Sequence, residues 1–198
     1  MNLATKADAS ADWQARCWQE LQTHYSEKHR HYHNLDHLEY MFRLWEHHQQ
    51  QWQDAAIVAF AIFYHDAIYN VKRKDNEEKS AELAAKRLNE LGLSNDRIAR
   101  CVQHILATKA HHLSEDPDTN LLVDIDLAIL GDTPEVYRAY TQKVRKEYRI
   151  YPDLLYKPGR KKVLRHFLAM PRIYHTDILY HHREQAARQN LEAELAAL

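Results

Sequence analysis

The residues best suited to chemistry are histidines and aspartates that stand inside apolar stretches. His65 and Asp66 follow 55–64, the most apolar run of the chain. Burying an ionised carboxylate without a partner is costly, and a cation is the simplest partner. The doublet therefore indicates a metal site. The alternative is a buried His–Asp pair that bonds only to backbone or to other side chains.

A second candidate carboxylate lies in the apolar decapeptide 121–130. On a helix, Asp126 has only apolar neighbours three and four positions away, whereas Asp124 has Asn120 on one side. The pattern predicts that Asp126 faces inward as a metal ligand, and it keeps Asp124 as a substitute ligand or a supporting residue. The alternative is that one of the two aspartates caps a helix or pairs with a basic residue.

Two further imidazoles lie in the segment 33–37. Spacing of four places His33 and His37 on one face, provided that the helix extends back to His33. One imidazole could then bind a metal while the other faces a substrate. The alternative is a capping segment, with Asn34 or Asp36 as the cap.

Together these residues offer two imidazoles and two carboxylates, from His37, His65, Asp66 and Asp126. Mixed nitrogen and oxygen ligands suit divalent Mn, Fe, Co, Ni or Zn, and Mg is a further candidate. Four protein ligands on a six-coordinate ion leave places for water and a substrate oxygen. Metal-activated water could then attack a phosphate ester.

Helices are the elements expected to position these residues. Three glycines and five prolines in 198 residues are too few for a hairpin-rich fold. Apolar residues recur at helical spacing in most of the chain, and 111–119 is predicted to be a loop. In chain order, helices are predicted after Ser10, from near Leu35, over 55–69, from Asp75 or Asn76 to Gly92, and after Ser94 or Asn95. Further helices are predicted over 121–130, from Pro134, over 160–170 and over 174–198. We predict an all-α, single-domain bundle of about eight helices over 1–198.

The composition narrows the partners and the compartment. Lys and Arg number 27 and Asp and Glu 28, which gives no global attraction to nucleic acid or to an anionic membrane. Cys17 and Cys101 are the only cysteines, as is typical of a reducing compartment. Neither a signal peptide nor an apolar run of the ~20 residues that span a bilayer is visible. We expect a cytoplasmic protein with no membrane partner and no stable nucleic-acid partner, which can form oligomers.

Several other classes of site are absent from the sequence. Neither Glu-x-x-His nor His-Glu-x-x-His occurs, which disfavours a di-iron bundle and a zinc metalloprotease. Three scattered glycines form no P-loop, dinucleotide fingerprint or Gly-x-Ser-x-Gly elbow. The basic run Arg160, Lys161, Lys162 and Arg165 is interpreted as a solvated helix face in preference to a nucleic-acid site.

The order of these motifs resembles a known family. His37, then His65-Asp66, then Asp126 resembles the H…HD…D signature of the HD-domain superfamily of metal-dependent phosphohydrolases. His33-Asn34-x-x-His37 is similar to the first motif of cyclic nucleotide phosphodiesterases, which share this helical core. Within the superfamily the chain most resembles a group of short bacterial predicted metal-dependent HD phosphohydrolases. The matching stretches are 32–37, 63–69, 75–81, 105–111 and 123–131, with further likeness at 159–160 and 187–190.

The resemblance implies an HD-type helical fold and hydrolysis of a phosphate ester, from a nucleotide or another small phosphorylated metabolite. By that likeness His37 is a metal ligand and His33 the proton donor to the leaving oxygen. As a mechanistic hypothesis, Asp66 also orients the attacking water and Lys109 contacts the phosphate. Arg160 is a weaker candidate contact, with ordinary solvated charge as the preferred interpretation.

Two alternatives stay open beside this hypothesis. One metal ion is expected, but a second could bind near His111, with His104 and His112 as further candidate ligands. The protein could also be a regulatory HD module that binds nucleotide or metal with little turnover, because fold does not fix function. Glu77 and Glu78 could enter the site, although acidic residues at a helix N-terminus are the simpler interpretation.

Overall fold

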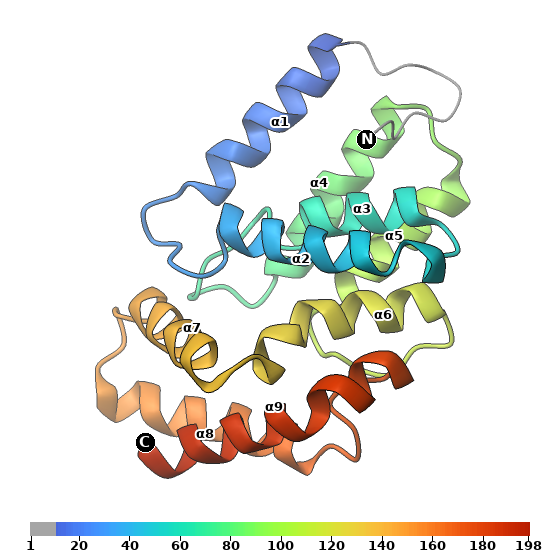
Figure 1. Cartoon of the computed structure of the whole chain (residues 1–198). Helices are drawn as coiled ribbons and strands as arrows, with labels where there is room; N and C mark the ends of the chain where they lie inside the picture. Colours follow the sequence, from blue (N-terminus) through green and yellow to red (C-terminus); the bar gives the residue numbers. More distant parts are fainter. Residues whose placement is uncertain (1–10) are drawn as a thin grey trace. The chain divides into compact units, whose positions relative to one another are not determined.

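The computed structural model describes residues 11–198. Over that range it contains nine α-helices, two short 3-10 helices and no strand, which confirms the predicted all-α class (Figure 1). The helices divide into two compact units, one ending at Leu122 and the other running from Val123 to Leu198. This boundary falls inside a helix and not in a linker. The single domain over 1–198 stays a prediction.

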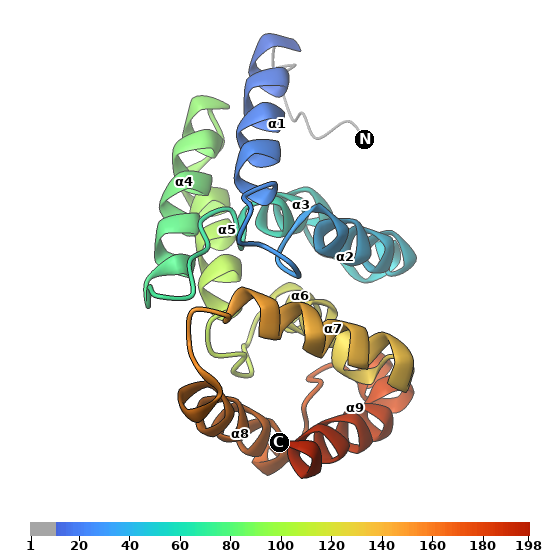
Figure 2. The ribbon, with the colours of Figure 1, turned by 90° about the vertical axis from the view of Figure 1, so that its left-hand side faces the viewer.

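The first unit is arranged around its most apolar helix. Its elements are α1 Ala11–Tyr25, α2 Leu35–His47, η1 Gln49–Gln51, α3 Ala55–Tyr64, α4 Asn76–Glu90, α5 Asn95–Ala107 and the first part of α6 Pro117–Asp126. Seven of the ten residues of α3 are buried. A helix that is apolar on all faces must be covered on all faces. Accordingly α3 packs against α2, α4 and α5, and Figure 2 shows it between α2 and α5.

Three helix boundaries in this unit differ from the prediction. α3 ends at Tyr64, not Tyr69, so the His65-Asp66 doublet lies just beyond it. α2 begins at Leu35 and does not extend back to His33, because Asn34 is its N-cap. α6 begins at Pro117, which was predicted to be in a loop, although Pro suits the first turn of a helix. Ser10, predicted to precede the first helix, lies outside the described residues.

Other predicted boundaries are confirmed. α4 ends just before Gly92, whose φ of +69° is the left-handed conformation that glycine adopts after a helix. α5 begins after Ser94, and α7 begins at Pro134. Cys17 and Cys101 are buried free thiols, and burial raises the pKa of Cys101 to about 12.

The second unit is assembled around the chain that follows α6. Its further elements are η2 Leu127–Gly131, α7 Pro134–Glu147, α8 Asp153–Ala169 and α9 Asp177–Ala197. η2 packs against α7 and α9, and α8 packs against α9. A Cβ at Gly131 would lie 2.6 Å from Arg183 Cβ, so the close approach of η2 to α9 requires glycine there. In residues 11–198 no helix combines the length and apolar character needed to cross a membrane.

Candidate metal centre

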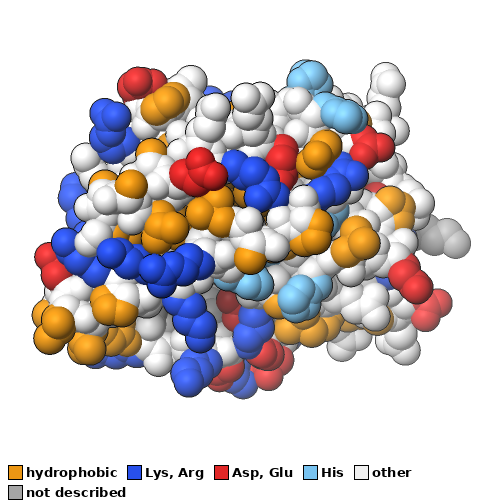
Figure 3. All heavy atoms as spheres, turned by 90° about the horizontal axis from the view of Figure 1, so that it is seen from below, with side chains coloured by type: hydrophobic (Ala, Val, Ile, Leu, Met, Phe, Trp, Pro, Cys, Tyr) orange, Lys and Arg blue, Asp and Glu red, His pale blue; other side chains and the backbone are white. Residues whose placement is uncertain are grey.

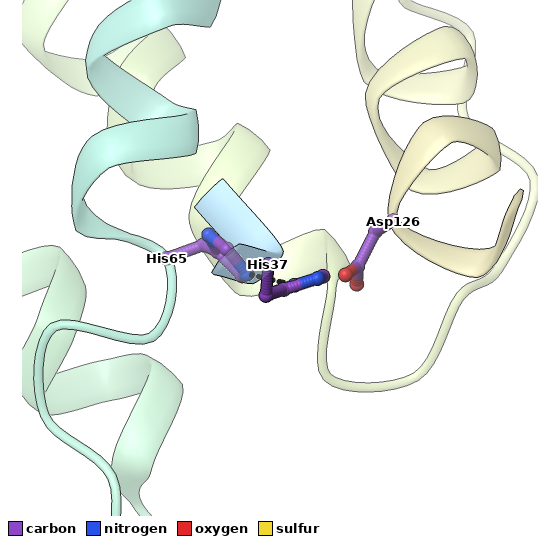
Figure 4. A group of neighbouring side chains, drawn as sticks. All are labelled: His37, His65 and Asp126. Atoms are coloured by element: carbon purple, nitrogen blue, oxygen red, sulfur yellow. Dashed lines mark hydrogen bonds between the residues drawn. The ribbon is translucent and has the colours of Figure 1, made fainter. Parts of the chain in front are cut away.

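Two buried imidazoles meet in the first unit. His65 follows the end of α3 and His37 lies in the first turn of α2, and their Nε2 atoms are 3.3 Å apart (Figure 4). On its other side, His65 Nδ1 lies 2.8 Å from the carbonyl oxygen of Ile62. A carbonyl oxygen only accepts hydrogen bonds, so the ring hydrogen of neutral His65 lies on Nδ1. His65 therefore presents the lone pair of Nε2 to His37.

The separation of the two nitrogens fits a shared divalent ion. Two imidazole nitrogens bound at about 2.0–2.1 Å, at an angle of about 90–110°, lie about 2.8–3.4 Å apart. The distance of 3.3 Å between His37 Nε2 and His65 Nε2 is within that range. A second nitrogen held by a backbone carbonyl is also the usual arrangement of metal-binding histidines. The other arrangement that fits is an N–H···N hydrogen bond donated by His37.

The Asp66 carboxylate lies beside His65. Its Oδ2 lies 3.2 Å from His65 Nε2, and its side chain is 14% exposed. With the His65 hydrogen on Nδ1, both atoms are acceptors, and their close approach is unfavourable unless a proton or a cation lies between them. His65 Nε2 thus faces Asp66 Oδ2 on one side and His37 Nε2 on the other, but among residues 11–198 no group of three mutually close metal-ligating side chains includes Asp66.

Arg30, which the sequence analysis missed, joins the two segments that carry these ligands. Its side chain is fully buried, with 0% exposure. The guanidinium donates hydrogen bonds to the carbonyl oxygens of Asp66 at 2.6 Å, Ala67 at 2.9 Å and His33 at 3.2 Å, and Nε donates to Glu27 at 2.9 Å. The segment before α2 is thereby fixed against the segment after α3.

Aromatic rings complete the surroundings of Arg30. Its guanidinium lies 5.1 Å from the ring centroid of Tyr25 and 5.4 Å from that of Tyr69, within the range of cation–π attraction. No sequence pattern identified Arg30, because two of its acceptors are the backbone carbonyls of Asp66 and Ala67, which are 36 and 37 residues away in the sequence. The only sequence signal is an arginine between Tyr25 and the ligand motif.

His33 lies beside the metal ligands although it precedes α2. Its ring stacks on Tyr69 at 4.3 Å between centroids, and it lies 5.9 Å from the ring of His37. Tyr32 also packs against His37, at 4.9 Å. The predicted neighbourhood of His33 and His37 is therefore present, but it is produced by the capping segment and not by one helix face.

The start of α3 is fixed by two aspartates. Asp54 caps α3 by accepting from the Ile57 N–H at 3.2 Å, and Arg97 donates to its carboxylate at 2.8 and 2.9 Å. Burial raises the pKa of Asp54, but the hydrogen bonds from Arg97 and Ile57 and the positive charges nearby together outweigh burial, and the pKa is lowered. Buried Asp118 in α6 accepts from the backbone N–H groups of Gln53 and Asp54 at 2.8 and 2.9 Å. The beginning of α6 is thus joined to the beginning of the helix that precedes His65.

The two aspartates of the second unit have different surroundings. Asp124 is fully buried, and its oxygens accept from the His175 N–H and the Thr176 N–H, each at 2.7 Å, and from the Thr176 hydroxyl at 2.6 Å. It therefore binds the backbone just before α9, whose N-cap is Thr176, and neither caps a helix itself nor pairs with a basic side chain in these contacts. Asp126, the last residue of α6, is half-buried. Asp124, and not Asp126 as predicted, is the more buried carboxylate, because the segment that covers Asp124 is distant in the sequence; Asp126 as a metal ligand stays a prediction.

Lys109 and Arg160 are both engaged by carboxylates. Lys109 forms an ion pair with Glu78 and donates to the carbonyl oxygen of Lys74 at 2.6 Å. The predicted phosphate contact of Lys109 therefore has no support from its position. Arg160 donates to both oxygens of Glu194 at 2.7 and 2.8 Å, and its side chain is only 9% exposed. The interpretation of Arg160 as solvated charge is wrong, since it belongs to a buried ion pair.

The histidines considered for a second metal do not gather. Within residues 11–198, no group of three or more metal-ligating side chains includes His104, His111 or His112. His104 Nδ1 lies 2.8 Å from the Thr119 hydroxyl. Glu77 and Glu78 lie in the first turn of α4, as the simpler interpretation stated.

No family model, curated protein or solved structure matches this chain. The likeness to the HD-domain superfamily therefore rests on the residues themselves.

Proposed function

We propose that this chain is a metal-dependent phosphohydrolase of HD type, in which His37, His65, Asp66 and Asp126 bind one divalent ion. The observation that carries the proposal is the buried pair of imidazoles with Nε2 atoms 3.3 Å apart and Asp66 beside it. The separation of the two imidazole nitrogens fits a shared divalent ion, and imidazole nitrogen and carboxylate oxygen are ligand types that such ions bind. With its hydrogen on Nδ1, His65 Nε2 is an acceptor that faces the Asp66 carboxylate, and a bound cation relieves the repulsion between these two acceptors.

Asp126 is the proposed ligand from the second unit. It follows His37 and the His65-Asp66 doublet in the order of motifs that resembles the HD-domain signature. Asp124 is not proposed as a ligand, since its oxygens bind the start of α9.

The chain's own residues have distinct roles in the proposed reaction. A divalent ion, when bound, lowers the pKa of water and polarises a phosphoryl oxygen. His33, half-buried beside His37, is the proposed proton donor to the leaving oxygen. Asp66 orients the attacking water by accepting one of its hydrogens. The stacking of His33 on Tyr69 holds the donor ring in place. No catalytic part is proposed for Lys109.

The substrate class and the location are also proposals. The resemblance supports a phosphate ester of a nucleotide or another small metabolite. Two buried free thiols support a reducing compartment, and we propose the cytoplasm.

The test combines metal analysis with hydrolysis assays. Purified full-length protein is analysed for bound metals and assayed with an aryl phosphate and a panel of nucleotides, beside Asp66→Ala and the exposed control Asp96→Ala. We expect metal content and turnover to be lost in Asp66→Ala and kept in Asp96→Ala. Unchanged metal content and activity in Asp66→Ala would contradict the proposal. Nucleotide binding without any turnover would favour the regulatory module.

A further inference from the structure

Three large apolar side chains are exposed where α7 leads into α8. Ile150 is 47% exposed, Leu154 84% and Leu155 63%. Single exposed apolar residues are ordinary, but a group of them indicates a binding surface. α8 begins at Asp153, so the two leucines lie in its first turn. We call Ile150, Leu154 and Leu155 the α8 tip.

The α8 tip lies in the most basic part of the chain. Residues 143–166 contain nine Lys and Arg against two Asp and Glu, a surplus of seven in a chain whose net charge is −1. Not all of this surplus is available at the surface, since Arg145 pairs with Asp153 at 2.6 Å and buried Arg160 pairs with Glu194 at 2.7 Å; of the two acids, Glu147 is only 4% exposed. Exposed bases stand on both sides of the tip at Lys146, Arg149, Lys162 and Arg165. Figure 3 shows Lys and Arg side chains at the surface beside exposed hydrophobic ones.

We propose that the α8 tip and these four bases bind the surface of an anionic phospholipid membrane, with the leucines entering the headgroup region. Apolar side chains flanked by Lys and Arg are the composition that binds such a surface, where burial of apolar area and attraction to anionic lipid add together. The balanced charge of the whole chain conceals this attraction, because the excess of acidic residues lies elsewhere in the sequence.

Other partners fit the α8 tip less well. A nucleic acid would attract the bases but leave the leucines in water. A symmetric contact with a second copy would bring the same surplus of positive charge together. Leu154, at 84% exposure, projects from the surface. A lipid headgroup region accepts such a side chain without a matching pocket.

The experiment is cosedimentation of the full chain with vesicles of phosphatidylcholine, with and without phosphatidylglycerol. We expect binding only to the anionic vesicles, and weaker binding at high salt. Leu154→Ser/Leu155→Ser and, separately, Lys162→Glu/Arg165→Glu should each reduce binding by about ten-fold or more. The matched controls are Leu113→Ser, at a 72% exposed leucine, and Lys72→Glu/Lys74→Glu, at exposed lysines. The controls should bind like the wild type.

Circular dichroism establishes that each variant is folded, and size-exclusion chromatography establishes the oligomeric state. Failure of the wild type to bind anionic vesicles would overturn the proposal. So would equal binding by the tip variants and the controls, or a wild-type oligomer that Leu154→Ser/Leu155→Ser converts to monomer.

Discussion

The Arg30 side chain fixes the backbone segments that carry the candidate metal ligands. It does so through backbone carbonyl groups and not through the ligand side chains. Three backbone carbonyl oxygens and Glu27 accept hydrogen bonds from a guanidinium that is shielded from water. A lysine keeps the charge but not the planar set of donors, so it cannot satisfy the same acceptors. Arg30 is therefore a positioning residue for the candidate metal centre.

Arg30→Lys should weaken metal binding and lower stability together. We expect the free energy of unfolding to fall by about 1–3 kcal/mol, because buried carbonyl groups lose their partners. Metal affinity should fall by about 10–100-fold, as for other residues that support metal ligands. Urea unfolding and metal titration measure the two effects. The control is Arg43→Lys, at a side chain 68% exposed, which should change neither. Wild-type metal affinity in Arg30→Lys would refute the positioning role.

His104 gives the protein a pH dependence that is separate from the metal ligands. The residue is fully buried, and burial lowers its pKa below the ordinary value. Below about pH 6.5 the unfolded chain therefore binds a proton that the folded chain does not. The contribution of His104 to stability is present above that pH and is lost as the pH falls.

His104→Gln should reduce the acid sensitivity of the fold. Between pH 7.5 and 5.5, the wild type should lose up to about 1.4 kcal/mol per pH unit more than the variant. Urea unfolding of metal-free protein at the two pH values gives the comparison. His47→Gln, at an exposed histidine, serves as the control and should keep the wild-type slope. The same slope in His104→Gln and in the wild type would show that burial of His104 does not affect stability.

At the scale of elements, the approach of η2 to α9 depends on one residue without a side chain. A Cβ at Gly131 would meet both Cβ and the carbonyl oxygen of Arg183, at 2.6 and 2.7 Å. A Cβ at Gly159, within α8, would meet nothing within 4 Å. The same substitution at these two glycines should therefore have opposite effects.

Gly131→Ala should lower the free energy of unfolding by about 1–3 kcal/mol, because the backbones must separate. Gly159→Ala should raise it by about 0.5–1 kcal/mol, because alanine loses less conformational freedom than glycine in a helix interior. Thermal and urea unfolding of the two variants test this. Equal effects in both would mean that η2 and α9 do not pack as described.

The elements also show what the sequence could predict. Helical spacing found α1, α5 and α7, because one face of each is apolar and local signals mark the starts of α5 and α7. It placed the end of α3 five residues too late. The carbonyl groups of Asp66 and Ala67, just past that end, accept from Arg30. Contacts with residues so distant in the sequence cannot be predicted from the spacing of apolar residues.

The same reason explains the two aspartates near the end of α6. The helical neighbours of Asp124 and Asp126 are apolar except for Asn120 beside Asp124, and this single local difference ranked the burial of the two aspartates in the wrong order. The backbone N–H groups of 175–176 donate to Asp124, and this distant segment covers its side chain. Ordered motifs predicted that His37 and His65 come together, and the two imidazoles are adjacent: His65 follows the apolar helix α3, and His37 lies on the buried face of the amphipathic helix α2.

At the scale of the whole molecule, the two compact units meet within α6 and not in a linker. The net charge of one segment also differs strongly from the net charge of the whole chain. The segment 143–166 is basic although the chain is nearly neutral. The proposed metal centre draws ligands from both units, so metal binding should couple to the stability of the complete chain. Binding to the folded state alone stabilises a protein by mass action.

X-ray absorption spectroscopy of the full-length protein, loaded with one equivalent of Zn²⁺ or Mn²⁺, tests the metal centre most directly. The account predicts one tightly bound ion per chain, coordinated by two imidazole nitrogens and by carboxylate oxygens. His37→Ala should reduce the imidazole count to one, while exposed His47→Ala leaves it at two. A chain that retains no ion, or an ion with no imidazole ligand, would contradict the account.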